Sequence, residues 1–482
     1  MLPSSTEHAP KNVEELKDLL RHDTKVKVAG VDVEGVLRGK VMSKSKLLSS
    51  VKSNGFNFCS IIFGWDIHDK TYEKELLVTN QDSGYRDLVA VIDLSTFRRL
   101  QWEKDIPLFL CRFVVPETGE ALPVDPRSLI GSVTDKASLL GYKCMSGAEF
   151  EYFQFAENPH SLADKGFHNL KPLTPGMHGY SLLRPTLNID YFHDLYDYAV
   201  KFGIEVEGHH TETGPGVYET ALGYTDAARM ADNACLFKLV AKSIGMKYGI
   251  TPTFMAKPWG DLPGCSGHIH VSLQNDKGDN VFAVSDKEAA NGGRANAAFE
   301  DVKYISQEGE WFLAGLLEGM PDVVPMFCPT INSYKRLQGG RAMFAPDTAS
   351  YGYDSRAASV RLITAPSVKG YATRFEVRVP GADMNPYYAI ATIFALGLRG
   401  IEEKRPLPYG PIDSPDVTHE TLIQLPTSLE SATEAFMRKD SAARKILGDY
   451  FVDHYGGTRQ HELDLHRKAV TDWEVARYFE LV

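Results

Sequence analysis

The sequence predicts an α+β protein with a small strand-rich domain over residues 1–118 and a larger domain over residues 119–482. Two patterns carry this prediction. Short strand-like runs dominate the first part, whereas strands alternate with well-signalled helices in the second. Between them, the Pro- and Gly-rich segment 116–126 (PETGEALPVDP) is typical of a domain boundary.

In the first domain, residues 12–22 are expected to form a short helix. Residues 25–33 and 36–43 are expected to form two strands joined by a turn at Glu34 and Gly35. In the second domain, helices are expected over 191–202 and over 225–244, the latter ending at Gly245.

The most strongly marked helix begins at Pro386, with Asn385 as its N-cap. Further helices are expected from about residues 428, 441 and 459.

Composition excludes several classes of protein. With 43% hydrophobic and 24% charged residues, the chain is ordinary globular material, and its net charge of −11 argues against nucleic-acid and membrane-surface binding. The apolar stretch 389–398 is too short to span a membrane. The acidic N-terminus and the absence of paired cysteines predict a cytoplasmic protein whose six cysteines are reduced and buried, without zinc or disulfides.

Three strand-like segments have one polar and one apolar face. Successive side chains of a strand point to opposite sides of a sheet, so a period of two places these polar residues on one face. The segments GAEFEYF, HIHVSL and RFEVRV present Glu149 and Glu151; His268, His270 and Ser272; and Arg374, Glu376 and Arg378. A solvent-facing sheet accounts for any one of them alone. Together they predict a curved sheet whose polar face lines a cavity.

A fourth segment, EVEGHHTETGPGVYE, adds Glu205, Glu207, Glu212 and Glu219. Carboxylates that converge without cations raise one another's pKa values, and divalent ions remove that repulsion. A donor set dominated by carboxylate oxygens favours Mg²⁺ or Mn²⁺ over zinc. A purely structural role fits the neighbouring His209 and His210 equally well.

The segment 336–378 contains the motif arginines Arg336, Arg356, Arg361, Arg374 and Arg378. Guanidinium groups suit carboxylate and phosphate oxygens, and metal ions with several arginines are the usual requirement for phosphoryl transfer. The alternative is a scatter of surface arginines.

With these motifs in order, the sequence resembles the glutamine synthetase family, specifically its bacterial-type (class I) branch, over nearly the whole chain. The motifs are an E-x-E strand, two glutamates after a His-His pair, K-P-x-x-G-D with G-x-S-G-H-x-H, N-S-Y-K-R, R-x-A-S-x-R, and R-x-E-V-R with N-P-Y.

The resemblance implies a role for each matching residue. It implies a first metal site at Glu151, Glu212 and Glu219, and a second at Glu149, His268 and Glu376. It implies nucleotide contacts at Glu207, Tyr224, His270 and Ser272, ATP-phosphate contacts at Arg361 and Arg374, and glutamate contacts at Gly264, Arg336 and Arg378. Catalytic roles fall to Arg356, Arg336 and Glu376, of which Arg356 stabilises the transferred phosphate.

The family also implies a β-grasp N-terminal domain on a catalytic α/β barrel, and a homo-oligomer of stacked rings, a dodecamer or decamer. Each active site is completed by the N-terminal domain of a neighbouring subunit. ATP phosphorylates the γ-carboxyl group of glutamate with the help of Mg²⁺ or Mn²⁺ at two or three sites, and an amine then attacks the acyl phosphate.

The ammonia pocket departs from the family pattern. The family's F-D-G-S-S-x-x-G-W segment corresponds to NFCSIIFGW, residues 57–65, which places Phe58 at the aspartate and Ile61 at the serine. The family's flap glutamate is replaced by Phe344, while the pocket tyrosine is retained as Tyr180. A slip in this alignment would bring Asn57 or Ser60 into the pocket instead.

Loss of the acidic groups predicts an apolar pocket, because an ammonium ion without acceptors is costly to bury. The leading hypothesis is therefore a ligase that joins glutamate to an organic amine, a polyamine or monoamine. An ordinary glutamine synthetase and a non-catalytic ring-forming scaffold are the alternatives. No general base is identified; Asp66, His68 and Asp69 lie near the segment in sequence.

Overall fold

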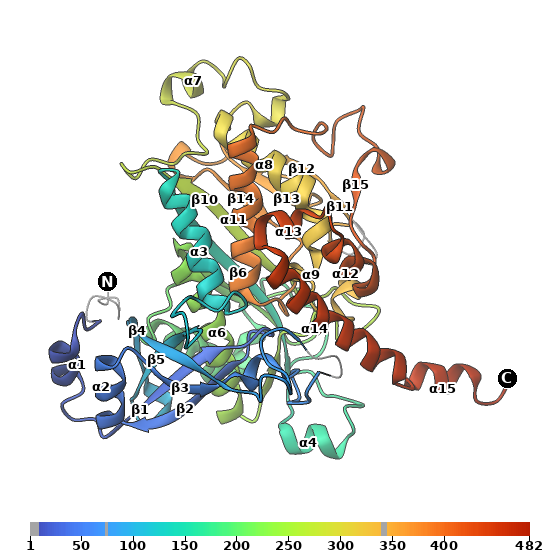
Figure 1. Cartoon of the computed structure of the whole chain (residues 1–482). Coiled ribbons are helices and arrows are strands. Elements are labelled where there is room, and N and C mark those ends of the chain that lie inside the picture. Colours follow the sequence, from blue (N-terminus) through green and yellow to red (C-terminus); the bar gives the residue numbers. More distant parts are fainter. Residues whose placement is uncertain (1–8, 73–75, 339–344) are drawn as a thin grey trace.

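The computed structural model describes residues 9–72, 76–338 and 345–482 (Figure 1). Its N-terminal part is a five-stranded sheet in the order β2-β1-β5-β4-β3, in which β1 runs parallel to β5 and every other pairing is antiparallel. The strands are β1 (Lys25–Val31), β2 (Leu37–Ser43), β3 (Phe56–Cys59), β4 (Asp87–Leu100) and β5 (Ile106–Val114), accompanied by helices α1 (Val13–Leu19) and α2 (Lys44–Lys52). The helix expected within residues 12–22 and the two strands expected over 25–33 and 36–43 are confirmed as α1, β1 and β2.

A second sheet of eight strands carries the predicted polar segments. Its path is β12-β13-β14-β10-β6-β8-β7, and β9 pairs with β6 beside that path. The strands are β6 (Lys143–Phe155), β7 (Val206–Thr211), β8 (Val217–Asp226), β9 (Thr251–Thr253), β10 (Gly267–Gln274), β12 (Tyr351–Tyr353), β13 (Val360–Ile363) and β14 (Arg374–Val377). Strands β11 (Thr348–Ala349) and β15 (Ile423–Gln424) pair separately. The α+β fold class is thus confirmed.

Helices cover this sheet and make up much of the rest of the described residues. They are α3 (Pro126–Leu139), α4 (Pro159–Asp164), α5 (Ile189–Lys201), α6 (Ala227–Lys247), α7 (Asp286–Ala290), α8 (Gln307–Gly319), α9 (Val324–Phe327), α10 (Ser333–Leu337), α11 (Pro386–Glu403), α12 (Leu429–Met437), α13 (Ala442–Leu447), α14 (Asp449–Lys468) and α15 (Asp472–Tyr478). No helix in the described ranges is both long and apolar enough to cross a membrane.

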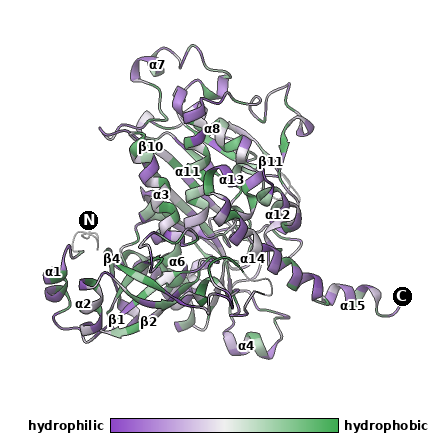
Figure 2. Cartoon of the chain, in the orientation of Figure 1, coloured by the Kyte–Doolittle hydropathy of each residue, from purple (hydrophilic) through white to green (hydrophobic). Residues whose placement is uncertain are grey.

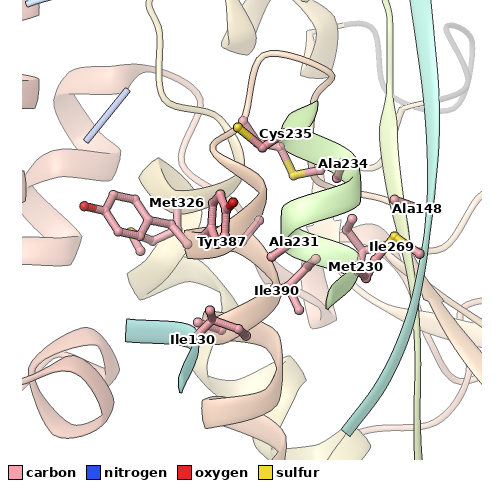
Figure 3. Close-up of a cluster of buried hydrophobic side chains, with 14 of the residues drawn as sticks. Ile130, Ala148, Met230, Ala231, Ala234, Cys235, Ile269, Met326, Tyr387 and Ile390 are labelled. Carbon is pink, nitrogen blue, oxygen red and sulfur yellow. The ribbon is translucent and has the colours of Figure 1, made fainter. Parts of the chain in front are cut away.

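The core lies between the large sheet and helices α6 and α11. Figure 3 shows Met230 and Ala231 of α6 between Ile390 of α11 and the sheet residues Ala148 and Ile269. Hydrophobic residues gather in these central elements, whereas the outlying α7 and α15 are mostly hydrophilic (Figure 2). Asn385 caps α11 as predicted, its side chain accepting a hydrogen bond from the Tyr387 N–H.

Two helices differ from the expected bounds. Helix α6 continues through Gly245 to Lys247, because that glycine permits a close approach to the next strand: a Cβ there would lie 2.5 Å from Pro252 Cδ. Helix α14 begins at Asp449 rather than near residue 459. Its internal glycines, Gly456 and Gly457, lie against Met437 and Leu76, so packing outweighs their low helix propensity.

Helix α14 joins the C-terminal end of the chain to the N-terminal sheet. Its Arg459 forms an ion pair with Glu34, 425 residues earlier, and both side chains are nearly inaccessible. Nearby, the Asn385 side chain donates to the backbone carbonyls of Asp32 and Val33. The β1–β2 turn is therefore held by two elements of the larger part.

We predict that Arg459→Leu lowers the free energy of unfolding by about 3–5 kcal/mol, because it leaves the Glu34 carboxylate buried without a partner. Urea denaturation measures the change. The matched control is Arg467→Leu on the same helix, which breaks an exposed pair with Glu430 and is expected to cost less than about 1 kcal/mol. Equal losses in the two variants would contradict the prediction.

Candidate active site

The register of the strands in the large sheet brings the predicted polar residues together. Across β6 and its neighbours, Glu149 lies opposite His268 of β10, and Glu151 opposite Glu219 of β8. His270 of β10 lies opposite Glu376 of β14. The polar faces that the period-two pattern predicts therefore stand side by side in one sheet, while the alternate residues of β10 are buried.

One cluster of metal-binding side chains consists of Glu149, His270 and Glu376, whose donor atoms lie within 4.8 Å of one another. The His270 Nε2 is 3.0 Å from a Glu149 oxygen. The His268 Nδ1 lies 3.2 Å from Glu376 and 3.6 Å from Glu149. The structure thus gathers the predicted second metal set, and it adds His270, which sequence reasoning had placed with the nucleotide.

A second cluster consists of His210, Glu212 and Glu219, again with donor atoms within 4.8 Å. Sequence reasoning missed His210, because a His-His pair gives no sign of which imidazole faces the carboxylates. Glu151 of the predicted first set stands opposite Glu219, and one of its oxygens accepts hydrogen bonds from the backbone N–H and hydroxyl of Ser266.

The donor groups fit divalent cations. The Oε2 atom of Glu212 is buried and has no hydrogen-bond partner. Burial, reinforced by the charges of Glu151 and Glu149, raises the pKa of Glu219 to about 9. Although burial raises the pKa of Glu376 as well, His268 and its neighbours hold it at about 2. The unpartnered Glu212 oxygen and the repulsion that opposes ionisation of Glu219 fit a site that a bound cation would complete.

Two arginines, one on β13 and one at the end of β14, contact Glu376 of the first cluster. Arg361 donates to a Glu376 oxygen at 2.9 Å and also pairs with Asp354, while Arg378 bonds the other Glu376 oxygen. Arg356 is exposed. These contacts give Glu376 two cationic neighbours in addition to the histidines.

Arg336 is buried and donates to the carbonyl oxygen of Val379. It packs against Gly264, where a Cβ would lie 2.8 Å from the Arg336 Cγ and 2.4 Å from the carbonyl oxygen of Ala256. A glycine is therefore needed at this position.

A cavity of about 270 Å³ opens beside the first cluster, and Glu149 and His270 of that cluster line it. Five of the six residues expected to bind ATP line it, namely Glu207, Tyr224, His270, Ser272 and Arg374; Arg361 is not among its lining residues. Tyr371, which sequence reasoning missed, also lines the cavity, and it is 79% exposed. No local pattern marks Tyr371, because it lies in a short helical turn before β14.

The predicted amine-binding residues fall in different surroundings. Tyr180 stacks on the His210 ring at 4.3 Å between centroids, which places it over the cluster of His210, Glu212 and Glu219. Phe58 is partly buried against Phe113, and Ile61 is partly buried in the turn after β3. Phe344 lies outside the described residues.

The residues considered for an alternative alignment differ in accessibility. Asn57 is exposed, whereas the hydroxyl of Ser60 is buried and donates to Thr79. Of the candidate bases, Asp66 is buried and hydrogen-bonded through both carboxylate oxygens, while His68 and Asp69 are exposed. All six cysteines are free as expected, although Cys59 is exposed rather than buried.

Comparison with known proteins identifies the family. Residues 123–478 match the model of the glutamine synthetase catalytic domain. The chain is 43% identical over 461 residues to type-1 glutamine synthetase 2 of Dictyostelium discoideum, covering 95% of this chain and 84% of that protein. It is 35% identical to the glutamate–isopropylamine ligase of a Pseudomonas species, covering 95% of each, and 31% identical to the γ-glutamylethanolamide synthetase of Streptomyces coelicolor, covering 99% and 98%.

The family model and these relatives show a glutamate ligase of the glutamine synthetase type. The chain belongs to the glutamine synthetase family. A solved structure of GmaS with ADP has the same fold, with a TM-score of 0.78 over 96% of this chain and 99% of that one at 23% identity.

We predict that the metal-free protein loses stability as the pH rises. The pKa of Glu219 is about 9 in the folded state against an ordinary value near 4.5, so the stability it contributes is complete below pH 4.5 and is lost as the pH rises through 9. Glu219→Gln should remove this slope and be more stable than the unsubstituted chain at pH 8 in chelator.

In the same experiment, Mn²⁺ should raise the melting temperature of the unsubstituted protein by several degrees, through preferential binding to the folded state. The Glu219→Gln variant should lose most of that rise. Thermal denaturation with and without metal checks both expectations, and a metal-induced rise that Glu219→Gln leaves intact would contradict them.

A third prediction concerns Gly264→Ala. The added Cβ cannot fit between Arg336 and the Ala256 carbonyl without displacing one of them. We expect kcat/KM for glutamate to fall at least about tenfold, equivalent to about 1.4 kcal/mol, with KM for ATP little changed. Gly131→Ala in α3, where a Cβ also meets nothing within 4 Å, is the control and should behave as the unsubstituted enzyme.

Proposed function

We propose that this protein forms γ-glutamyl amides from glutamate and an organic amine, with ATP as the phosphoryl donor. The observation that carries the proposal is a contrast within one site. The residues expected to bind metal, ATP and glutamate are all present, whereas Phe58 and Ile61 replace the acid and hydroxyl of the family's ammonia pocket. Of two relatives that match nearly the whole chain, one is named as a glutamate–isopropylamine ligase and the other as a γ-glutamylethanolamide synthetase.

The proposed roles follow the family pattern. Glutamate is bound by Arg336 and Arg378 beside Gly264, and the nucleotide occupies the cavity lined by Glu207, Tyr224 and Ser272. The two clusters would hold Mg²⁺ or Mn²⁺, which when bound would supply positive charge to the phosphate oxygens. Arg356, Arg361 and Arg374 add fixed charge there, and Glu376 is held ionised by its histidine and arginine neighbours.

The reaction then runs in two steps. The γ-carboxylate of glutamate attacks the terminal phosphorus of ATP, giving γ-glutamyl phosphate and ADP. The amine nitrogen attacks the acyl carbon, loses a proton, and expels phosphate. An apolar pocket favours the second step for an amine with a carbon body, since it offers hydrophobic contact and little compensation for a small ammonium ion.

The proposal extends to assembly and location. As in the family pattern, the active site is completed by the N-terminal domain of a neighbouring copy, in a homo-oligomer of stacked rings. Six free cysteines accord with a reducing, cytoplasmic location. Ordinary glutamine synthesis is the second candidate, and the 43% identity to a protein named type-1 glutamine synthetase 2 favours it.

Phosphate release with ATP, Mg²⁺ or Mn²⁺ and glutamate tests the proposal, comparing ammonia with methylamine, ethanolamine, putrescine, spermidine and an aromatic amine. We expect turnover with at least one organic amine at concentrations where ammonia is inert, with the γ-glutamyl amide identified by mass spectrometry. Efficient glutamine formation would overturn the proposal in favour of glutamine synthetase. No phosphate release with any nucleophile would favour the non-catalytic ring-forming scaffold.

Substitution of the pocket sharpens the test. Ile61→Ser should lower kcat/KM for the preferred amine by about tenfold, because it removes about 1–2 kcal/mol of apolar contact. The KM values for ATP and glutamate should not change. Ile67→Ser is the matched control, since Ile67 is exposed and lies outside the 57–65 segment. An equal effect of both variants would show that Ile61 is not in the pocket.

A further inference from the structure

The segment expected to form the amine pocket, residues 57–65, is followed by a tight turn centred on Asp66. One carboxylate oxygen of Asp66 accepts the backbone N–H groups of His68 at 2.8 Å and Lys70 at 3.0 Å. The Asp66 backbone N–H also donates to the Lys70 carbonyl. This turn fixes where the segment leaves the N-terminal sheet.

The second carboxylate oxygen of Asp66 is held from the other end of the chain. It lies 3.2 Å from the Nε2 atom of His461 on α14, and both side chains are only 7% exposed. The His461 ring also meets the Tyr72 ring edge-on, with 5.0 Å between centroids. The Tyr72 hydroxyl in turn donates to the carbonyl oxygen of Trp65 at 2.7 Å. His461 is therefore connected to the segment both through Asp66 and through Tyr72.

Charges around this contact are already paired. Arg38 lies over the Trp65 ring at 5.7 Å and forms ion pairs with Asp69 and Asp32. Arg459 pairs with Glu34. His461 is thus the side chain of α14 that contacts Asp66, and each carboxylate oxygen of Asp66 already has a hydrogen-bond partner in the turn or on α14.

We propose that His461 is a positioning residue for the amine-binding segment, which it orients through Asp66 and Tyr72. The inference rests on the proposed function, because it takes residues 57–65 as a wall of the amine pocket. Since the family pattern has each N-terminal domain complete a neighbour's site, His461 of one copy sets the nucleophile affinity of the site in the next.

The experiment compares three single substitutions on α14 in the intact assembled enzyme. His461→Leu removes the hydrogen-bond donor and the ring contact, whereas His461→Gln keeps a donor at the same reach. Tyr455→Phe is the control, because it removes a buried hydrogen bond from the same helix to the Pro325 carbonyl, away from the segment.

We expect His461→Leu to raise KM for the nucleophile about tenfold while KM for ATP and glutamate stays within about twofold, and His461→Gln to recover most of the loss. The nucleophile is whichever one the unsubstituted enzyme uses, ammonia included, so the identity of the substrate is decided separately. Equal effects of His461→Leu and Tyr455→Phe on all three KM values would overturn the proposal.

Hydrogen exchange supplies a readout that does not depend on turnover. Peptides covering residues 57–66 should exchange at least about tenfold faster in His461→Leu than in the unsubstituted protein, and at unchanged rates in Tyr455→Phe. Unchanged exchange in His461→Leu would also overturn the proposal, even if the unsubstituted chain turned over none of the nucleophiles.

Discussion

Carboxylates that face one another across β6, β8 and β14 repel, and much of the larger part of the chain is arranged around that repulsion. Glu376 is offset by Arg361, Arg378 and the imidazoles of β10, so it is ionised although buried. Among the described residues no arginine pairs with Glu219, whose oxygen lies 4.0 Å from the His210 Nε2, and its raised pKa marks the position at which a bound metal ion would relieve the repulsion. The sheet thus separates a set of carboxylates neutralised by protein from a set that depends on a ligand.

That separation also explains how binding and folding are connected here. The apolar alternate residues of β6 and β10 pack on α6 and α11, so the polar residues cannot turn away from one another without uncovering the core (Figure 3). The cost of assembling like charges is therefore met by hydrophobic burial in the metal-free protein. Cations and nucleotide then stabilise an arrangement that already exists.

Sequence patterns predict this sheet well because period two is a local property, and register follows once the apolar faces are buried. Glu149, His268 and Glu376 are brought together as expected. The additional roles of His210 and Tyr371 could not be predicted, since His210 is distinguished from His209 only by the face it presents, and Tyr371 only by the cavity beside it. The continuation of α6 through Gly245 could likewise not be predicted, because the contact with Pro252 on the following strand outweighs the tendency of a glycine to end a helix.

The ion pair between Glu34 and Arg459 has a consequence for how the protein is made. The two residues are separated by 425 positions, so at synthesis rates of roughly 5–20 residues per second Glu34 leaves the ribosome at least about 20 seconds before its partner is even polymerised. During that interval the β1–β2 turn carries a carboxylate meant for the interior, exposed to water and to chaperones. Docking of the N-terminal sheet is thus completed only after helix α14 has been synthesised and folded against it.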